Sequence, residues 1–450
     1  MSILKNTTPD LSNIKTRTRY LQLLLLTVAG GAIYPMLYMR QIYQTTMLEA
    51  FQISNGQLGT LYALLGLFFF FSYAPSGWLA DRINPMKLIV CSLLGTGLLG
   101  LWYSTLPDYV SLKCIYAGWG VTTGLTFWGA VMKRINLLAG DGESGRFYGF
   151  YDGGRGLVEA LLASLALAIF SYTASDDNSH VVGALVNVIH MYAWLCIALA
   201  GLCVFGVYYE VKRDIARDHI APKQSRSELI ADIMLILRQP EVWLIAVIIA
   251  AGYHLFWATY SFSAYLQEGN WGFTAVMAGT ITTIKLWLRP VGGVVGGILG
   301  DKYSNLKVLY ITLLFSTFGL CGLVMVPMMG LNPTVTMSLC VFFILLVGLL
   351  TYAIRGLYWA ITEHLNMPAH RLGLTIGIIS VLGYCPDIFI PLINGYLMDI
   401  ASTPQEGYQM YFGYTIVVSI MGLVACKLLQ VRTRRTSQQP QVQAATAEVI

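Results

Sequence analysis

Charged side chains are scarce in this sequence. Asp, Glu, Lys and Arg make up 11% of its 450 residues, whereas apolar residues make up 56%. In an average soluble domain, about 25% of the residues are charged. So few charges cannot cover so much apolar surface in water. The composition therefore excludes an ordinary soluble fold and predicts a protein with many membrane-spanning segments.

Motifs for catalysis and cofactor binding are also missing. The eight cysteines lie mainly in apolar runs without the spacing of metal ligands, so we interpret them as small core residues. No phosphate-binding Gly-x-x-x-x-Gly-Lys-Ser/Thr loop, zincin motif or nucleophile elbow occurs. We therefore expect no enzyme activity, no metal, no cofactor and no ATP-driven transport by this chain alone. The basic residues that give a net charge of +5 follow the membrane edges, so no nucleic-acid partner is expected.

Long apolar runs are the most prominent feature of the sequence. A membrane-spanning helix needs about 20 predominantly apolar residues. By that rule the sequence predicts an all-α membrane protein with twelve spans. They lie at 20–45, 57–80, 86–106, 109–132, 146–171, 183–209, 241–266, 274–298, 306–327, 334–363, 372–398 and 408–430.

One long charged loop, at 211–240, divides the predicted spans six and six. The resulting domains are a six-helix bundle at 20–210 and a second at 241–430. Within the loop, residues 225–237 could form a short amphipathic helix on the inner membrane surface.

The distribution of basic residues predicts the orientation. Most of the 28 Lys and Arg residues lie in the N-terminal segment, the central loop, the tail and alternate turns, and the six other loops hold none. Because basic loops stay in the cytoplasm, both ends are expected to be cytoplasmic, namely residues 1–19 and the Gln- and Ala-rich tail at 431–450. We expect the tail to be disordered and the protein to lie in the cell inner membrane.

An internal repeat links the two halves. The stretch from Gly77 to Lys87 recurs 220 positions later, from Gly297 to Lys307. Matches at one offset indicate an internal duplication. The aligned pairs include Gly77 with Gly297, Asp81 with Asp301, Arg82 with Lys302 and Lys87 with Lys307.

Two six-helix halves, the long central loop and the Gly-x-x-x-Asp-Arg turn after the second span closely resemble the major facilitator superfamily. The resemblance covers about residues 18–432 and implies two pseudo-symmetric bundles that alternate access to a central site. It further implies that the turns form a gate between the bundles, with Arg134 as the charge partner of Asp81. The gate residues implied are Gly77, Asp81, Arg82, Lys87, Arg134, Gly297, Asp301 and Lys302.

Two subgroups of that superfamily are suggested by local features. Asn84-Pro85 in the turn and Arg40 in the first span resemble the organophosphate/phosphate antiporter branch, although the arginine of that branch is missing from the seventh span here. Gly145-Arg146 and Gly154-Arg155-Gly156 in the fifth span look still closer to a group of bacterial inner-membrane transporters.

Charges inside the predicted spans mark candidate sites, because a charge at the centre of a bilayer costs about 2.5–3.5 kcal/mol on insertion scales. The deep cations outnumber the deep acids, so we expect a net positive central cavity. The cations are Arg40, Arg155, Lys285, Arg289 and Arg355; the acids, candidates for proton coupling, are Asp152, Glu159 and Asp387.

Two of these groups allow a functional and a structural interpretation. Lys285 and Arg289 are four positions apart on one helical face, so either an anion binds between them or one reaches a carboxylate and the other reaches water. Asp152, Arg155 and Glu159 share a face of the fifth span. Either Arg155 binds solute while an acid takes a proton, or the three neutralise one another.

The superfamily geometry places spans one, four, seven and ten around the central cavity. Arginines with tyrosines suit a carboxylate, phosphate or sulfonate beside a sugar-like body. For each aromatic residue the alternative is ordinary helix packing, and for His254 it is a satisfied interior histidine. Besides Arg40 and Arg355, the candidates on these spans are Tyr38, His254, Trp257, Tyr260 and Tyr358.

Taken together, these features favour a monomeric secondary transporter that moves a small anionic organic solute by alternating access. Its partners would be the solute, a proton or counter-anion, and the lipid bilayer. Two alternatives stay open: a proton-coupled symporter of a neutral solute such as a sugar or nucleoside, and a non-transporting sensor on the same scaffold.

Overall fold

The computed structural model describes residues 16–139, 143–174, 180–211, 226–269, 271–365 and 369–447. All regular secondary structure in these ranges is helical. The chain forms two compact units. Unit 1 comprises residues 1–39, 49–52 and 64–223, and unit 2 comprises residues 40–48, 53–63 and 224–450.

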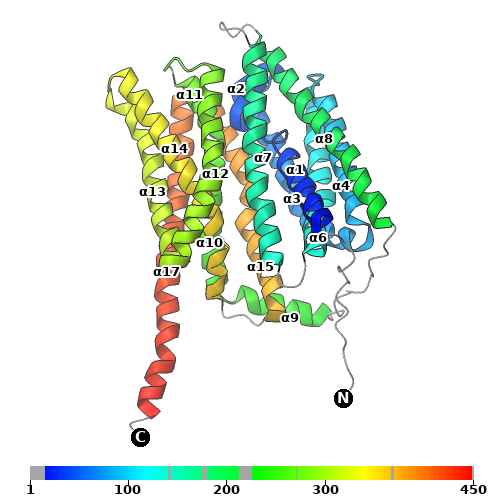
Figure 1. Cartoon of the computed structure of the whole chain (residues 1–450). Coiled ribbons are helices and arrows are strands. Elements are labelled where there is room, and N and C mark those ends of the chain that lie inside the picture. Colours follow the sequence, from blue (N-terminus) through cyan, green and yellow to red (C-terminus); the bar gives the residue numbers. More distant parts are fainter. Residues whose placement is uncertain are drawn as a thin grey trace. The chain divides into compact units, whose positions relative to one another are not determined.

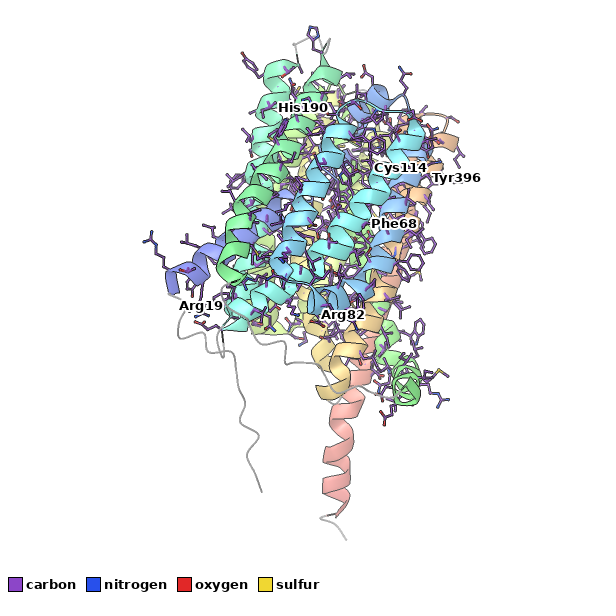
Figure 2. All side chains as sticks on the ribbon, turned by 90° about the vertical axis from the view of Figure 1, so that its right-hand side faces the viewer. Arg19, Phe68, Arg82, Cys114, His190 and Tyr396 are labelled. Carbon is purple, nitrogen blue, oxygen red and sulfur yellow. The ribbon has the colours of Figure 1, made fainter. Side chains whose placement is uncertain are left out.

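Unit 1 is a helical bundle in which α4 packs against α8 and α1 packs against α7. Arg19 and Arg82 lie at one end of it, and Cys114 and His190 lie toward the other (Figure 2). Arg19 and the turn that follows α3 are therefore on the same side of unit 1. Its helices are α1 (Thr16–Ala32), the second part of α3 (Asn55–Arg82), α4 (Pro85–Tyr103), α5 (Tyr109–Trp119), the π-helix η2 (Gly120–Trp128), α6 (Gly129–Leu138), α7 (Ser144–Thr173) and α8 (Val181–Val211).

Unit 2 contains long helices that run side by side (Figure 1), with α12 against α14 and α10 against α17. Its elements are most of α2 (Arg40–Phe51), the first part of α3, α9 (Arg226–Leu237), α10 (Pro240–Ala258), η3 (Thr259–Ser261), α11 (Phe262–Glu268), α12 (Ala275–Tyr303), α13 (Asn305–Met325), η4 (Val326–Met329), α14 (Pro333–Leu357), η5 (Ala360–His364), α15 (Ala369–Tyr384), α16 (Pro386–Ile400) and α17 (Pro404–Ala447).

Several predicted spans are broken helices. The first expected span, 20–45, divides into α1 and α2, separated by a turn that contains Pro35. Proline removes a helical hydrogen bond and clashes with the preceding turn, which explains the break. The seventh expected span, 241–266, changes from α-helix to a 3-10 turn at Thr259–Ser261. The eleventh, 372–398, is broken before Pro386.

Among the described residues, eight helices are long and apolar enough to cross a membrane, and α2 with the first part of α3, bent by 118°, would make a ninth. The remaining expected spans correspond to α1, to the α5–η2–α6 segment and to α12. Of these three segments, α1 has 17 residues, α5–η2–α6 is interrupted by a π-helix, and α12 carries charges and glycines. Twelve spans therefore stay a prediction.

Apolar side chains cover much of the exposed surface of these helices. On α12, for example, Val294 and Ile298 are 61% and 62% exposed. Large exposed apolar patches are rare on soluble monomers, whereas lipid tails solvate such side chains well. The surface therefore fits a lipid environment.

The short helix expected at 225–237 is present as α9, which lies across the ends of α10 and α15 (Figure 1). It buries Asp232 and exposes Ile230 and Met234, which are four positions apart and share one face. That exposed apolar face suits the membrane surface.

The last helix, α17, continues to Ala447, through most of the segment at 431–450 for which the sequence predicted disorder. Gln and Ala are good helix formers, so the helix can extend beyond its membrane-spanning part.

Candidate functional site

Unit 2 contains a buried carboxylate that accepts hydrogen bonds from α10. Asp387, in the first turn of α16, is 7% exposed. Its Oδ1 accepts hydrogen bonds from the Tyr253 hydroxyl at 2.5 Å and from Trp257 Nε1 at 2.8 Å. In the described part of the chain no cation lies within ion-pair distance of it. We call Tyr253, Trp257 and Asp387 the Asp387 cluster.

The guanidinium of Arg355, on α14, lies among aromatic rings. Its carbon is 4.1 Å from the centre of the Phe256 ring. Next to it, Tyr384 accepts a hydrogen bond from Trp359 Nε1 at 3.0 Å and shares another with the Tyr358 hydroxyl at 3.0 Å. Within the described residues Arg355 has no ion-pair partner. Arg355, Phe256, Tyr358, Trp359 and Tyr384 form the Arg355 cluster.

The two clusters are adjacent, because the Tyr253 ring packs edge-on against the Tyr384 ring with centroids 4.9 Å apart. Tyr260, another predicted site residue, packs on Trp257 with ring centroids 5.2 Å apart. A cation and an acid are thus held close together by aromatic side chains. This arrangement offers donors to an anion and an acceptor to a hydroxyl or a proton.

Arg40, at the start of α2, is 2% exposed. Its guanidinium donates to Asn394 Oδ1 at 2.8 Å and to Gln44 Oε1 at 3.1 Å, and its carbon lies 5.2 Å from the centre of the Tyr62 ring. In the structure Arg40 connects α2 to α16. Its role as a solute ligand stays a prediction. Tyr38, predicted beside it, belongs to unit 1.

His254 is a satisfied interior histidine, which was the structural alternative. Its Nδ1 lies 2.7 Å from the Ala250 carbonyl oxygen, and its Nε2 lies 2.9 Å from the Tyr414 hydroxyl. A carbonyl can only accept, so the proton is assigned to Nδ1, and Nε2 accepts from Tyr414. His254 points away from Asp387 because it follows Tyr253, which contacts Asp387, and adjacent residues of a helix point about 100° apart.

Lys285 and Arg289 differ in burial although they are four positions apart. Lys285 is fully buried, and its Nζ donates to the Thr259 carbonyl oxygen at 3.2 Å, whereas Arg289 is partly exposed. The carbonyl lies where α10 changes to a 3-10 turn, which frees backbone acceptors. This partner for Lys285 was not predicted and favours a structural role.

The fifth-span charges lie on α7 in unit 1. Arg155 pairs with Asp152 at 3.3 Å, as the neutralising interpretation expects, and lies 6.0 Å from the Tyr34 ring centre. Asp152 is 74% exposed, and Glu159 is partly buried near Tyr192. These residues lie in unit 1, whereas both clusters lie in unit 2.

The first repeat turn contains a different ion pair from the expected one. Asp81 pairs with Lys133 at 2.8 Å, whereas Arg134 is buried and donates to Gln22 on α1. Because adjacent helical residues point about 100° apart, only one of them can face Asp81. The prediction of Arg134 as the partner is therefore wrong.

The other gate residues have local roles. Arg82 lies 4.1 Å from the Trp78 ring centre, and Lys87 is exposed. Asn84 caps α4 by accepting from the backbone N–H groups of Met86 and Lys87. Pro85 follows at the first helical position, where it fits well.

The two gate glycines are not points of close contact, since a Cβ at Gly77 or Gly297 would meet no described atom within 4 Å. The close contact is at Gly129 instead, where a Cβ would lie 2.6 Å from Ser76 Oγ. In the second turn Asp301 and Lys302 are both exposed.

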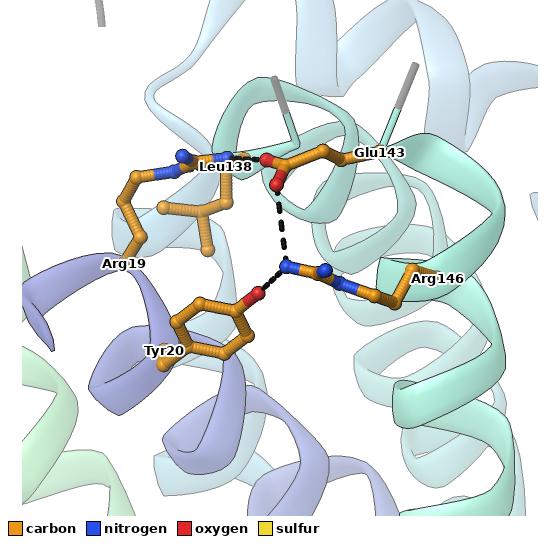
Figure 3. A network of polar contacts seen from close by, with 5 residues as sticks. All are labelled: Arg19, Tyr20, Leu138, Glu143 and Arg146. Atoms are coloured by element: carbon orange, nitrogen blue, oxygen red, sulfur yellow. Dashed lines mark hydrogen bonds and ion pairs between the residues drawn. The ribbon is translucent and has the colours of Figure 1, made fainter. Parts of the chain in front are cut away.

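A second polar network, shown in Figure 3, joins α1 to the α6–α7 connection in unit 1. Arg19 Nε donates to the Leu138 carbonyl oxygen at 2.8 Å, and Glu143 accepts from Arg19 at 2.5 Å and from Arg146 at 3.2 Å. Arg146 also contacts the Tyr20 hydroxyl. The network fixes the start of α1.

Sequence reasoning missed several polar residues of unit 2. Tyr253 could have been found, because it lies four positions before Trp257 and shares its helical face. No local sequence pattern pointed to Tyr62, Tyr384 and Asn394, because each contacts a residue that is distant in the sequence.

Comparison with known proteins identifies the family. Residues 21–391 match the Major Facilitator Superfamily. The chain belongs to this superfamily. The family expected from the sequence is therefore confirmed, and with it a multi-pass membrane protein of a transport superfamily.

Curated relatives of this superfamily member come from Escherichia coli (strain K12). Inner membrane protein YqcE is 30% identical over 417 residues, covering 92% of this chain and 94% of the relative. Inner membrane protein YihN is 26% identical over 426 residues, covering 94% and 97%. Their names agree with an inner-membrane location.

Solved structures share the fold at low identity. A bacterial homologue of the human lysosomal transporter Spinster, in an inward-facing and occupied conformation, has a TM-score of 0.70 at 14% identity, covering 93% of this chain and 98% of that one. The nucleoside transporter NupG has a TM-score of 0.65 at 13% identity, covering 90% and 98%. Such identities support the fold alone.

Proposed function

We propose that this protein is a secondary active transporter that moves a small anionic organic solute across the inner membrane by alternating access. The solute class is a sugar acid, a phosphate ester or a carboxylate. The observation that carries the proposal is Arg355, a cation with no ion-pair partner among the described residues, set in an aromatic cluster. A solute carboxylate or phosphate would supply the missing counter-charge.

The rest of the solute would contact the aromatic rings. Tyr358, Trp359 and Tyr384 present flat faces and polar edges, which suit a hydroxylated, sugar-like body. Trp257 and Tyr260, whose rings contact each other, would add two further aromatic rings to this surface. Most of the binding surface would thus be uncharged, and Arg355 would select for the anion.

Asp387 is the proposed proton carrier. It is buried, has no cation within ion-pair distance in the described segments, and receives both of its hydrogen bonds on one oxygen. The second oxygen would accept a proton or a solute hydroxyl. Arg355 lies close enough to act on it electrostatically, so solute and proton would influence each other.

The turn residues Asp81 and Lys133 would act at the inner gate. Their ion pair joins α3 to α6, and its carboxylate side chain is 72% exposed. An exposed pair is worth about 0–1 kcal/mol, so it can break and re-form during a transport cycle. The cytoplasmic position of this turn rests on the distribution of basic residues.

The test is uptake into proteoliposomes. D-glucuronate and glucose 6-phosphate are compared with neutral D-glucose, using Arg355→Gln and the control Arg432→Gln, which removes the exposed partner of Glu241. A hydrogen bond to a charged group is worth about 1.5–3 kcal/mol, so Arg355→Gln should weaken anion uptake about 10- to 100-fold. Arg432→Gln should leave it unchanged.

The other outcomes separate the alternatives. Glucose uptake that survives Arg355→Gln would favour a neutral-solute symporter. Binding in a thermal-shift assay without any uptake would favour a sensor. Anion uptake that Arg355→Gln does not change would contradict the proposed site.

A further inference from the structure

Three arginines gather in unit 1 where α1 and α7 begin. Arg17 and Arg19 lie in the first turn of α1, and Arg146 lies in the first turn of α7. We call them the α1–α7 basic patch. Among the described residues of this region the acid that pairs with them is Glu143, which contacts Arg19 and Arg146 (Figure 3). Three cations and one carboxylate leave the patch positively charged.

The contacts of Glu143 separate the roles of its two partners. Arg19 is 13% exposed, and it is occupied by the Leu138 carbonyl oxygen at 2.8 Å and by Glu143 at 2.5 Å. Arg146 is 64% exposed, and its contacts with Glu143 and the Tyr20 hydroxyl use Nη2. A guanidinium carries five N–H donors. Within the described residues, most donors of Arg146 therefore remain for an acceptor from outside the chain.

Tyr20 brings the second exposed arginine close to the first. The guanidinium carbon of Arg146 lies 5.6 Å from the centre of the Tyr20 ring. Arg17, which is also exposed, is three positions before Tyr20 on α1, and residues at that spacing are neighbours on a helix surface. Two exposed guanidinium groups from two helices thus flank one tyrosine. A phosphate group can accept hydrogen bonds from both, because its charge is shared among its oxygens.

Apolar side chains follow the patch along both helices. Phe150 and Leu161 on α7 are separated by a rise of about 16 Å, which is about half of the ~30 Å hydrocarbon core of a bilayer. The exposed apolar side chains therefore extend over the depth of one leaflet. They follow Arg17 by four and seven positions and Arg146 by four, eleven and fifteen positions, so each set shares a helical face with its arginine: Leu21, Leu24, Phe150, Leu157 and Leu161.

The combination of charge and apolar length selects the occupant. A soluble phosphate would use the arginines and leave the apolar face unused. A zwitterionic lipid would cover the apolar face and gain less from the net positive charge. An anionic phospholipid satisfies both parts of the surface, and basic pockets between membrane helices on the cytoplasmic side bind such headgroups. The distribution of basic residues predicts that this end of α1 and α7 is cytoplasmic.

We propose that the α1–α7 basic patch is a binding site for an anionic phospholipid of the inner leaflet. The lipid phosphate accepts hydrogen bonds from Arg17 and Arg146, and the acyl chains lie along the exposed apolar faces of α1 and α7. Arg19 and Glu143 position Arg146 and do not contact the lipid. The site lies in unit 1 and is independent of the solute and of the clusters in unit 2.

The test is lipid binding to the purified full-length protein in detergent. Phosphatidylglycerol and phosphatidylcholine with identical acyl chains are titrated, and the lipid bound to each protein molecule is counted by native mass spectrometry. The test variant carries Arg17→Gln and Arg146→Gln. The control carries Lys87→Gln and Lys307→Gln, which remove the same charge from exposed positions in two other turns.

One arginine beside an anionic lipid contributes about fivefold to affinity, so the double arginine variant should bind phosphatidylglycerol about 20-fold more weakly than the wild type. The lysine control should bind it as the wild type does, and phosphatidylcholine should bind weakly to every variant. Equal affinity of the two double variants for phosphatidylglycerol, or equal affinity of the wild type for the two lipids, would overturn the proposal.

Two further measurements cover poor folding and other occupants. Arg17 is exposed and lies outside the network of Figure 3, so Arg17→Glu should weaken phosphatidylglycerol binding and keep the lipid-free unfolding midpoint of the wild type. Undiminished binding by Arg17→Glu would contradict the site. Excess inorganic phosphate should not displace the lipid. Displacement would assign the patch to a soluble anion, and wild-type dimers that exclude the lipid would assign the surface to a second copy of the chain.

Discussion

At the scale of single residues, position on a helix decides which side chains act together. Tyr253 and Trp257 are four positions apart on α10, and both donate to Asp387. His254 is one position along and contacts Tyr414 instead. The same rotation of about 100° per residue separates Lys133, which pairs with Asp81, from the buried Arg134.

A paired substitution tests this separation of roles. Asp387→Asn should abolish the acceleration of uptake by an inward proton gradient, because an amide cannot carry the proton, while solute exchange without a gradient continues. His254→Gln should keep the gradient response and instead lower thermal stability by about 1–3 kcal/mol, through loss of hydrogen bonds at a buried site.

The measurements are gradient-driven uptake, exchange in the absence of a gradient, and thermal unfolding of each variant. A gradient response lost in His254→Gln and retained in Asp387→Asn would reverse the assignment of the proton carrier.

At the scale of elements, a break in a helix leaves backbone groups that other side chains can bind. Where α10 becomes a 3-10 turn, the freed Thr259 carbonyl takes the Lys285 ammonium. Inside a membrane such groups must find partners within the protein. The two repeat turns also differ, because Asn84 and Pro85 start α4 with a favourable cap, whereas Ser304 between α12 and α13 has a φ of 128°.

That conformation makes a stability prediction. A non-glycine residue at positive φ carries strain, so Ser304→Gly should raise stability by about 1 kcal/mol. Ser104, which ends α4 with a φ of −67°, is the matched control. Ser104→Gly should be neutral or destabilising, because glycine there only adds freedom to the unfolded chain. Thermal unfolding in detergent measures both, and a lower midpoint for Ser304→Gly would contradict the expectation.

At the scale of the whole molecule, the sequence repeat and the contacts divide the chain differently. The central loop and the repeat give halves at 20–210 and 241–430, whereas residues 40–48 and 53–63 belong to unit 2 by their contacts. The orientation rests on the distribution of basic residues, which neither division tests. The orientation therefore needs its own test.

Reporter fusions provide it. Green fluorescent protein fused after residue 450 should fluoresce, and alkaline phosphatase at the same position should be inactive, because both ends are expected inside. Alkaline phosphatase fused after Asp108, in a loop without Lys or Arg, should be active. Active phosphatase at the C-terminus would invert the predicted topology.

Local patterns predicted a large part of the fold. Expected boundaries at 241–266 and 306–327 correspond to α10–α11 and α13, because long apolar runs have only one stable form in a bilayer. The break after Ala32 and the π-helix at Gly120–Trp128 were missed, since they depend on packing as well as composition. Asp387, Trp257 and Arg355 were predicted as site residues, but their grouping was not.

The sequence by itself determined the membrane class, the superfamily and an excess of cations over acids within the predicted spans, because composition, hydrophobic length and motif spacing are properties of the chain alone. Only the tertiary structure decided which of these charged side chains contact other parts of the chain. Arg40 meets Asn394 across 354 positions and Lys285 meets Thr259 across 26. Arg355 has no ion-pair partner among the described residues. The reason is physical: partners are set by the rotation and packing of helices, which no local pattern records.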